Sequence, residues 1–191
     1  FEVAADFPVI QVENTLKALQ DLAKFYLTKV NPKVVGITGS NGKTTTKDMT
    51  DAVLSSQYRV HKTQGNFNNH IGLPITILEM PIDTEVVILE MGMNHAGEIK
   101  VLSDLAEPDV AIITMIGESH IEFFGSRAGI ADAKMEISSG LKENGVLIYP
   151  GEEPLLQERV TFLTDKQLKT FGTAAENDLY PLNIDAQMNQ T

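Results

Sequence analysis

The feature that most constrains this sequence is a glycine-rich loop, residues 39–45, which follows a short apolar run and precedes a segment able to form a helix. The apolar run, residues 33–38, contains Val34, Val35 and Ile37, which is typical of a buried strand bounded by glycine. Small residues at such a junction let several backbone N–H groups point at one phosphate, and the following helix adds the positive end of its dipole. The sequence therefore predicts an α/β fold with a phosphate-binding loop.

The composition of this loop indicates which ligand it binds. Its residues are Gly39, Ser40, Asn41, Gly42, Lys43, Thr44 and Thr45. Lys43 can reach the terminal phosphates of a nucleotide, and the hydroxyl of Thr44 can bind magnesium. The usual spacing of the motif would place its first glycine at position 37, where this chain has Ile37. The alternative is a turn that only connects strand to helix, and we favour a site for ATP and Mg²⁺.

The rest of the chain repeats the alternation of strands and helices. Apolar residues at spacings of three and four predict a helix over residues 12–30, which Asn14 or Thr15 can cap. Further strands are predicted at 58–61, 85–90, 109–115 and 145–149, and further helices at 44–55, 97–105 and 128–141. Three later segments are too short to assign: 154–156, 168–171 and 180–184. This pattern predicts an α/β fold with a mostly parallel sheet and helices on both faces.

Composition narrows the class of protein and its partners. The 191 residues suit one sizeable domain, and 42% hydrophobic residues can form a core. The net charge of −11 argues against a nucleic-acid partner, and the absence of cysteine excludes disulfides and thiolate metal sites. No apolar run is long enough to span a membrane and no signal peptide is visible. We expect a cytoplasmic monomer that binds small molecules. Because the chain opens at Phe1 and ends in a polar tail, we also expect further sequence on both sides.

Residues 38–45 resemble the ATP loop of the Mur ligases and folylpolyglutamate synthetases, in which the position of Ile37 is commonly not glycine. Within that family, three later segments are similar to those of the members that add D-alanyl-D-alanine: residues 63–74, 89–99 and 116–122. The resemblance runs from about Val9 to Leu156. It implies a P-loop NTPase-like Mur ligase central domain over residues 12–191, truncated at its C-terminal end. Residues 1–11 would then be the tail of a preceding UDP-substrate domain with its linker.

The same resemblance implies an ATP-dependent carboxylate–amine ligase of peptidoglycan precursor synthesis. The carboxylate of UDP-N-acetylmuramoyl-tripeptide would attack the γ-phosphate of ATP, and the amine of D-alanyl-D-alanine would then attack the acyl phosphate. We expect little or no ligase activity from these 191 residues alone. Two alternatives stay open. One is another Mur ligase or a folylpolyglutamate synthetase, and the other is a nucleotide-binding module without ligase chemistry.

Two candidate metal ligands follow predicted strands. Glu90 ends the strand at 85–90, and ligands of open α/β sheets bind outside the carboxyl ends of strands. A carboxylate suits magnesium, although a solvated glutamate is the reading from sequence alone. His120 follows the strand at 109–115 and would by itself be a cap or a surface residue. The resemblance implies that both bind magnesium, although magnesium prefers oxygen to the ring nitrogen of histidine.

Lys134 completes the predicted catalytic residues, which are Lys43, Glu90, His120 and Lys134. From sequence alone Lys134 reads as an exposed lysine on a helix. The resemblance implies a carbamylated lysine, in which carbon dioxide adds to the neutral amine and the resulting carboxylate binds magnesium. That chemistry requires a lowered amine pKa, which burial or nearby positive charge can provide.

Four polar residues are candidates for substrate contact. Asn66, Asn68 and Asn69 crowd one loop, where asparagine is either ordinary turn chemistry or, by the resemblance, a contact to the muramoyl-peptide substrate. We weigh these two interpretations equally for any one of the three residues. Arg127 either balances ligand charge or only caps the helix that follows it.

Overall fold

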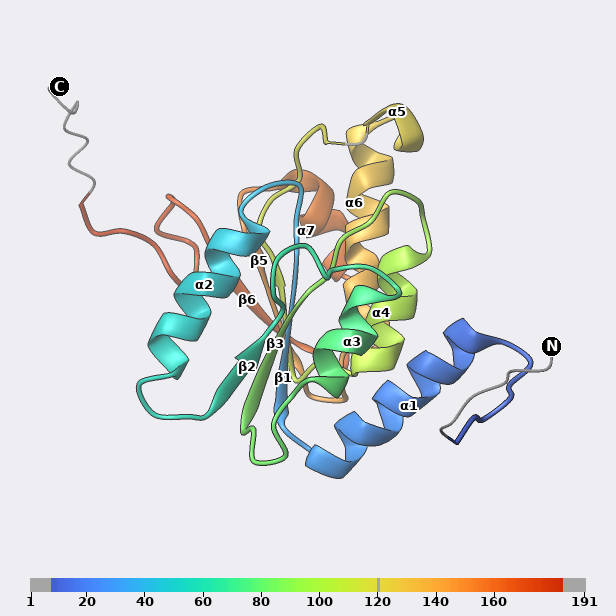
Figure 1. The fold of residues 1–191 in the computed structure, drawn as a ribbon. Helices are drawn as coiled ribbons and strands as arrows, with labels where there is room; N and C mark the ends of the chain where they lie inside the picture. The colour runs from blue at the N-terminus through green and yellow to red at the C-terminus, as the bar shows by residue number, and fades with distance from the viewer. Residues whose placement is uncertain (1–7, 120, 184–191) are drawn as a thin grey trace, which may run out of the picture.

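The computed structural model describes residues 8–119 and 121–183, so the predicted ligand His120 lies outside the described residues. Six strands form one sheet in the order β2-β3-β1-β4-β5-β6 (Figure 1). Their bounds are Lys33–Thr38 (β1), Val60–Lys62 (β2), Val86–Glu90 (β3), Val110–Ile113 (β4), Val146–Pro150 (β5) and Gln167–Phe171 (β6). All five pairings between these strands are parallel, which confirms the predicted parallel α/β fold.

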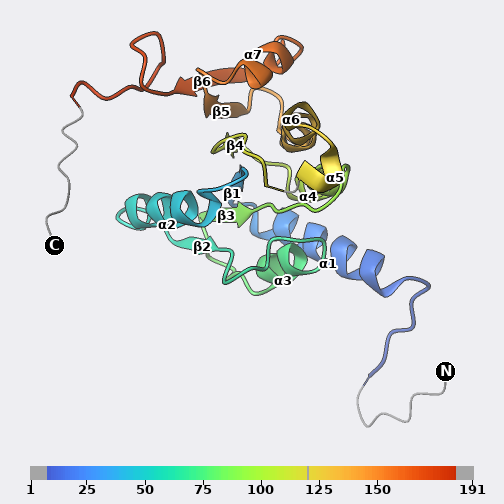
Figure 2. The ribbon, with the colours of Figure 1, turned by 90° about the horizontal axis from the view of Figure 1, so that it is seen from above.

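Helices cover both faces of the sheet, as predicted, but unequally. Their bounds are Thr15–Val30 (α1), Lys43–Leu54 (α2), Gly72–Leu78 (α3), Glu98–Ala106 (α4), Ile121–Phe124 (α5), Arg127–Met135 (α6) and Pro154–Val160 (α7). Figure 2 shows α2 on one side of the sheet and the other helices on the opposite side. The core beside α2 is correspondingly small, with Val35, Ile37, Val86 and Ile88 buried in it. Among the described residues, no helix has both the length and the apolar composition needed to cross a bilayer.

Local chemistry explains where the elements begin and end. The side chain of Asn14 accepts a hydrogen bond from the N–H of Lys17 at 2.9 Å, which confirms it as the cap of α1. The helix predicted at 128–141 is too long, because α6 ends at Met135 and continues as a short 3₁₀ turn, η1 (Glu136–Ser138). There the Ser138 hydroxyl donates to the Met135 carbonyl at 2.7 Å, in competition with regular helical bonding.

The sequence patterns missed helix α3, which follows the loop that carries Asn66, Asn68 and Asn69. The side-chain oxygen of Asn69 accepts from the N–H groups of Ile71 and Gly72, at 3.1 and 2.9 Å, and starts the helix. Pro74 lies in the first turn, where its missing N–H costs no helical hydrogen bond. Glycine and proline therefore begin a helix here, whereas in the sequence they resemble turn residues.

The strand register gathers the predicted site at one edge of the sheet. Ile37 of β1 lies beside Glu90 of β3, and Thr38 lies beside Ile113 of β4. All three strands run in the same direction, so the loops that follow them emerge together. The phosphate-binding loop, residues 39–45, therefore lies between the ends of β3 and β4.

Candidate active site

The phosphate-binding loop needs glycine at two positions, 39 and 42, for different structural reasons. Gly39 has a φ of 153°, and a Cβ atom there would lie 1.8 Å from the hydroxyl oxygen of Thr114. Gly42, with a φ of 81°, is the N-terminal cap of α2. Side chains rarely adopt such a backbone conformation, and Gly39 has no space for one. The close approach to Thr114 explains a glycine at position 39, two residues after the usual position.

The end of β4 fixes the loop in place. The N–H of Ser40 donates to the carbonyl of Met115 at 3.0 Å, and the N–H of Gly117 donates to the Ser40 hydroxyl at 2.8 Å. The Thr114 hydroxyl donates to the carbonyl of Asn41 at 2.5 Å. Contacts from outside the loop therefore hold its backbone in shape, so little reorganisation is needed when a phosphate binds.

Lys43 folds back over this loop. Its Nζ donates to the carbonyl of Gly39 at 2.8 Å, and the side chain is half-buried. Burial lowers the pKa of Lys43 from its ordinary value of 10.5, and the charge of Glu90 acts in the opposite direction. An ammonium held across a loop of backbone amides is the arrangement that binds the oxygens of a nucleotide's phosphates.

Glu90 has 3% of its surface exposed, at the carboxyl end of β3. One of its carboxylate oxygens accepts from the hydroxyl of Thr44 at 2.9 Å, and the other accepts from Nδ2 of Asn68 at 3.0 Å. Both donors are neutral, and among the described residues this buried carboxylate has no ion-pair partner. A hydroxyl and a carboxylate side by side match the oxygen preference of magnesium.

The residues present fit a magnesium ion whose coordination is completed by the phosphates of a bound nucleotide. Among the described residues, no three His, Cys, Asp or Glu side chains cluster closely enough to form a metal site of their own. Magnesium seldom needs such a cluster, because it commonly takes one or two carboxylates together with substrate phosphates. Thr44 and Glu90 supply that partial set directly beside the phosphate-binding loop.

Lys134 is buried, with 3% of its surface exposed, so its interpretation as an exposed helix lysine is wrong. Burial lowers the pKa of Lys134 to about 8, and the charge of Lys43 acts in the same direction. The structure gives its amine no hydrogen bond or ion pair with any described residue. The amine instead borders a cavity, and its lowered pKa is the condition that carbamylation requires.

Two adjoining cavities collect most of the predicted site residues. One, of about 230 Å³, is lined by Lys43, Asn68, Asn69 and Lys134 among others. The second, of about 470 Å³, is lined by residues of the phosphate-binding loop together with Asn66, Asn68 and Glu90. Ser40, Lys43 and Asn68 border both. The structure thus brings together every described site residue predicted from the sequence except Arg127.

Arg127 borders neither cavity. Its guanidinium donates to the carbonyl of Ile116 at 3.0 Å and to the carboxylate of Glu153 at 2.6 Å. Helix α6 is capped by Ser126, whose hydroxyl accepts from the N–H of Gly129 at 3.1 Å. The capping role considered for Arg127 is therefore filled by Ser126.

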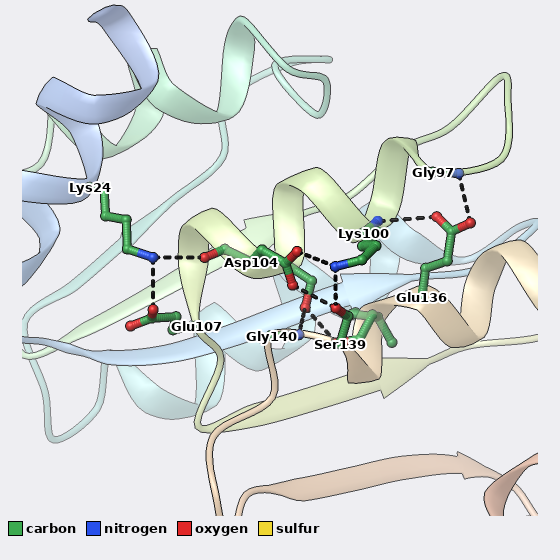
Figure 3. A network of polar contacts seen from close by, with 10 residues as sticks. Lys24, Gly97, Lys100, Asp104, Glu107, Glu136, Ser139 and Gly140 are labelled. Atoms are coloured by element: carbon green, nitrogen blue, oxygen red, sulfur yellow. Dashed lines mark hydrogen bonds and ion pairs between the residues drawn. The ribbon is translucent and has the colours of Figure 1, made fainter. Parts of the chain in front are cut away.

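No pattern in the sequence pointed to Glu136, which holds the far wall of the first cavity in place. The carboxylate of Glu136 accepts from the backbone N–H of Gly97 at 2.7 Å and of Lys100 at 3.1 Å, across to the start of α4 (Figure 3). Within α4, Glu98 accepts from the N–H of Asn94 at 2.6 Å. Asn94 and Glu98 both border the cavity, and Glu136 ties this wall to the segment that carries Lys134.

A parallel sheet whose β1 strand runs into a phosphate-binding loop, with a buried carboxylate ending the neighbouring strand, defines a nucleotide-binding α/β domain. Comparison with known families makes the class specific. Residues 37–191 match the family described as the Mur ligase middle domain, and the chain belongs to that family.

Individual relatives agree with this assignment. The chain is 63% identical over 170 residues to the UDP-N-acetylmuramoyl-tripeptide--D-alanyl-D-alanine ligase of Bacillus subtilis, covering 89% of the chain and 36% of that protein. The crystal structure of MurF from Acinetobacter baumannii superposes with a TM-score of 0.89 at 34% identity, covering 97% and 41%. The MurF ligase of Thermotoga maritima in complex with ADP gives 0.84 at 36% identity, covering 93% and 41%. The chain thus spans about two fifths of the length of these relatives.

Proposed function

We propose that the protein carrying this chain is an ATP-dependent ligase that joins D-alanyl-D-alanine to UDP-N-acetylmuramoyl-tripeptide during peptidoglycan precursor synthesis. The observation that carries the proposal is the grouping of Lys43, Glu90 and Lys134 around two adjoining cavities at one edge of the sheet. The names of the relatives supply the substrates. In this proposal residues 12–191 form the central ATP-binding domain, residues 1–11 are the tail of a UDP-substrate domain, and the protein is a cytoplasmic monomer.

In the proposed reaction, the phosphate-binding loop holds the triphosphate of ATP. Backbone N–H groups of residues 39–45 and the dipole of α2 face the phosphate oxygens, and the ammonium of Lys43 balances their charge. Because contacts from β4 already fix the loop, its donors are aimed before ATP arrives. Such prior orientation lowers the barrier because charge that develops on the transferred phosphoryl group meets donors already in place.

Thr44, Glu90, His120 and a carbamylated Lys134 would hold magnesium. When bound, magnesium neutralises charge on the phosphates and so favours attack by a negatively charged carboxylate. The carbamate forms when the neutral amine of Lys134 attacks carbon dioxide and loses a proton. Burial of that amine supports this assignment, because it raises the neutral fraction at a given pH.

The substrate carboxylate would attack the γ-phosphorus of ATP, giving an acyl phosphate and ADP. The amine of D-alanyl-D-alanine would then attack the carbonyl carbon, and inorganic phosphate would leave with the bonding electrons. We assign Asn66, Asn68, Asn69 and Arg127 to the muramoyl-peptide substrate. Asn68 and Asn69 border the cavity shared with Lys134, which supports their part of the assignment. Holding the two reactants together accounts for much of the catalysis in this scheme.

The decisive experiment measures phosphate release by the full-length protein with ATP, Mg²⁺ and UDP-N-acetylmuramoyl-tripeptide. Release that requires D-alanyl-D-alanine, and that glutamate or other amines do not support, is expected. Trapping of an acyl phosphate with hydroxylamine, when the amine is omitted, would identify the intermediate. Nucleotide binding without amine-dependent phosphate release would contradict the ligase proposal and leave a binding module.

Lys134 provides a separate test of the carbamate. Lys134→Ala should abolish ligation in the full-length protein, and short carboxylates such as acetate or propionate should partly restore it, because they can occupy the volume of the lost carbamate. An equally drastic change at the exposed Lys100, Lys100→Ala, controls for general effects of losing a lysine. Full activity of Lys134→Ala would remove the carbamate from the proposal.

A further inference from the structure

Next to the backbone of Glu90 lie two buried polar residues that the reaction above does not use. Lys47 of α2 has 4% of its surface exposed, and Thr63, which directly follows β2, has none. Lysine is almost never buried to this degree, because removing an ammonium from water is costly unless specific contacts replace the water. The contacts of this pair therefore indicate what it does.

Thr63 continues the hydrogen bonding between β2 and β3 beyond the end of β2. The N–H of Thr63 donates to the carbonyl of Ile88 at 2.9 Å, as in a continuing strand. The N–H of Glu90 then donates to the side-chain hydroxyl of Thr63 at 3.0 Å. This leaves the carbonyl of Thr63 free to accept from Nζ of Lys47 at 2.9 Å, while Asp48 lies 3.8 Å from the same ammonium.

These contacts join three segments that surround Glu90: helix α2, the end of β3 and the loop that begins at Thr63. Lys47 lies three residues after Thr44 and so on the same side of α2, and Thr44 bonds the carboxylate of Glu90 directly. Asn68, which bonds the other carboxylate oxygen, belongs to the loop that begins at Thr63. The backbone of Glu90 is thus held through Thr63 and Lys47, while its side chain is held through Thr44 and Asn68.

We infer that Lys47 and Thr63 are positioning residues, which hold the backbone of Glu90 so that its carboxylate is directed at a magnesium ion bound with ATP. In this inference neither residue contacts the nucleotide or the metal, and both act only through the backbone of Glu90. This inference rests on the proposed function, because it gives Glu90 the role of a metal ligand. It predicts that losing either contact weakens binding of the magnesium complex of ATP more than binding of ATP alone.

The test measures ATP affinity of the full-length protein by calorimetry, once with Mg²⁺ and once with EDTA. In Thr63→Val and in Lys47→Met, the ratio of the two affinities should fall by about tenfold, because a buried N–H or carbonyl loses its partner. Thr63→Ser keeps the hydroxyl and should stay within about twofold of wild type. Thr76→Val is the matched control, since Thr76 is also buried and its hydroxyl bonds a backbone carbonyl in α3.

The ratio separates positioning from loss of stability, because general loosening lowers both affinities by the same factor. An unchanged ratio in a folded Thr63→Val protein, or an equal loss in Thr63→Ser, would overturn the inference. If Thr63→Val does not fold, Lys47→Met carries the same test, and amide exchange at Glu90 should be faster in it than in wild type. If the ATP affinity of the wild-type protein is the same with Mg²⁺ and with EDTA, the proposed function itself is overturned, and the inference with it.

Discussion

Replacing Lys134 by methionine should change how the stability of the protein depends on pH. Methionine has a similar volume and no charge, so the substitution removes the buried amine and leaves little cavity. The pKa of Lys134 is lowered from 10.5 to about 8 in the folded protein, mainly by burial. Between these two pH values the unfolded chain binds one proton more than the folded chain, so the free energy of unfolding rises with pH.

The size of the effect follows from the shift. A difference of about 2.5 pKa units corresponds to about 3 kcal/mol, at about 1.4 kcal/mol per unit. This penalty for burying the protonated amine is fully present below pH 8 and is lost as the pH rises towards 10.5. Between about pH 7 and pH 9.5, the stability of wild type should rise relative to Lys134→Met by roughly 2 kcal/mol.

Urea denaturation of both proteins in buffers freed of carbon dioxide measures this difference directly. Adding bicarbonate should then stabilise wild type alone, because a carbamate replaces the buried ammonium with an anion that Lys43 attracts. A carbon-13 carbamate signal that appears in wild type and is missing from Lys134→Met would identify the modified residue. Parallel pH profiles for the two proteins would refute the assignment of a buried amine with a lowered pKa.

Four further substitutions test how the residues of the site are held in place. Lys43→Ala should weaken ATP binding by about 30-fold or more in calorimetry while the chain still folds, because the lost ammonium faces the phosphates. Gly39→Ala should destabilise the protein by roughly 2–4 kcal/mol in urea denaturation, and Thr114→Ala should recover part of this loss by removing the hydroxyl that the new Cβ would meet. Glu136→Ala should cost about 1–2 kcal/mol and accelerate amide exchange at Gly97, which loses its acceptor. Additive effects of Gly39→Ala and Thr114→Ala, or unchanged exchange at Gly97, would contradict these explanations.

Features encoded in neighbouring residues could be predicted from the sequence. The phosphate-binding loop is local, since strand, glycines, lysine and helix follow each other within residues 33–55. The proximity of Glu90 to this loop also followed, because the carboxyl ends of parallel strands meet at one edge. In both cases the chemistry depends on chain direction and spacing, which the sequence contains.

Features that depend on contacts between distant segments could not be predicted. The burial of Lys134 depends on how α6 packs against α4 and α7, and the same residues on an isolated helix would leave the amine in water. The ion pair of Arg127 with Glu153 joins residues 26 positions apart. Thr63 and Lys47 also look ordinary in the sequence. Their role depends on β2 ending beside β3, where the hydroxyl of Thr63, in place of a backbone carbonyl, accepts from the N–H of Glu90 and Lys47 bonds the carbonyl of Thr63.

The charges around the first cavity lead to a last prediction, on proton uptake. The chain carries a net charge of −11, yet the amines of Lys43 and Lys134 border one cavity, and the charge of Lys43 lowers the pKa of Lys134. An anion bound between them favours the charged amines and so raises the pKa of Lys134. Binding of metal-free ATP near pH 8 should therefore take up as much as about half a proton, since the amine is half protonated there. Calorimetry in buffers of different ionisation enthalpy measures this uptake. Lys134→Met should lose it, and proton release by wild type would show that the two amines do not share the bound anion.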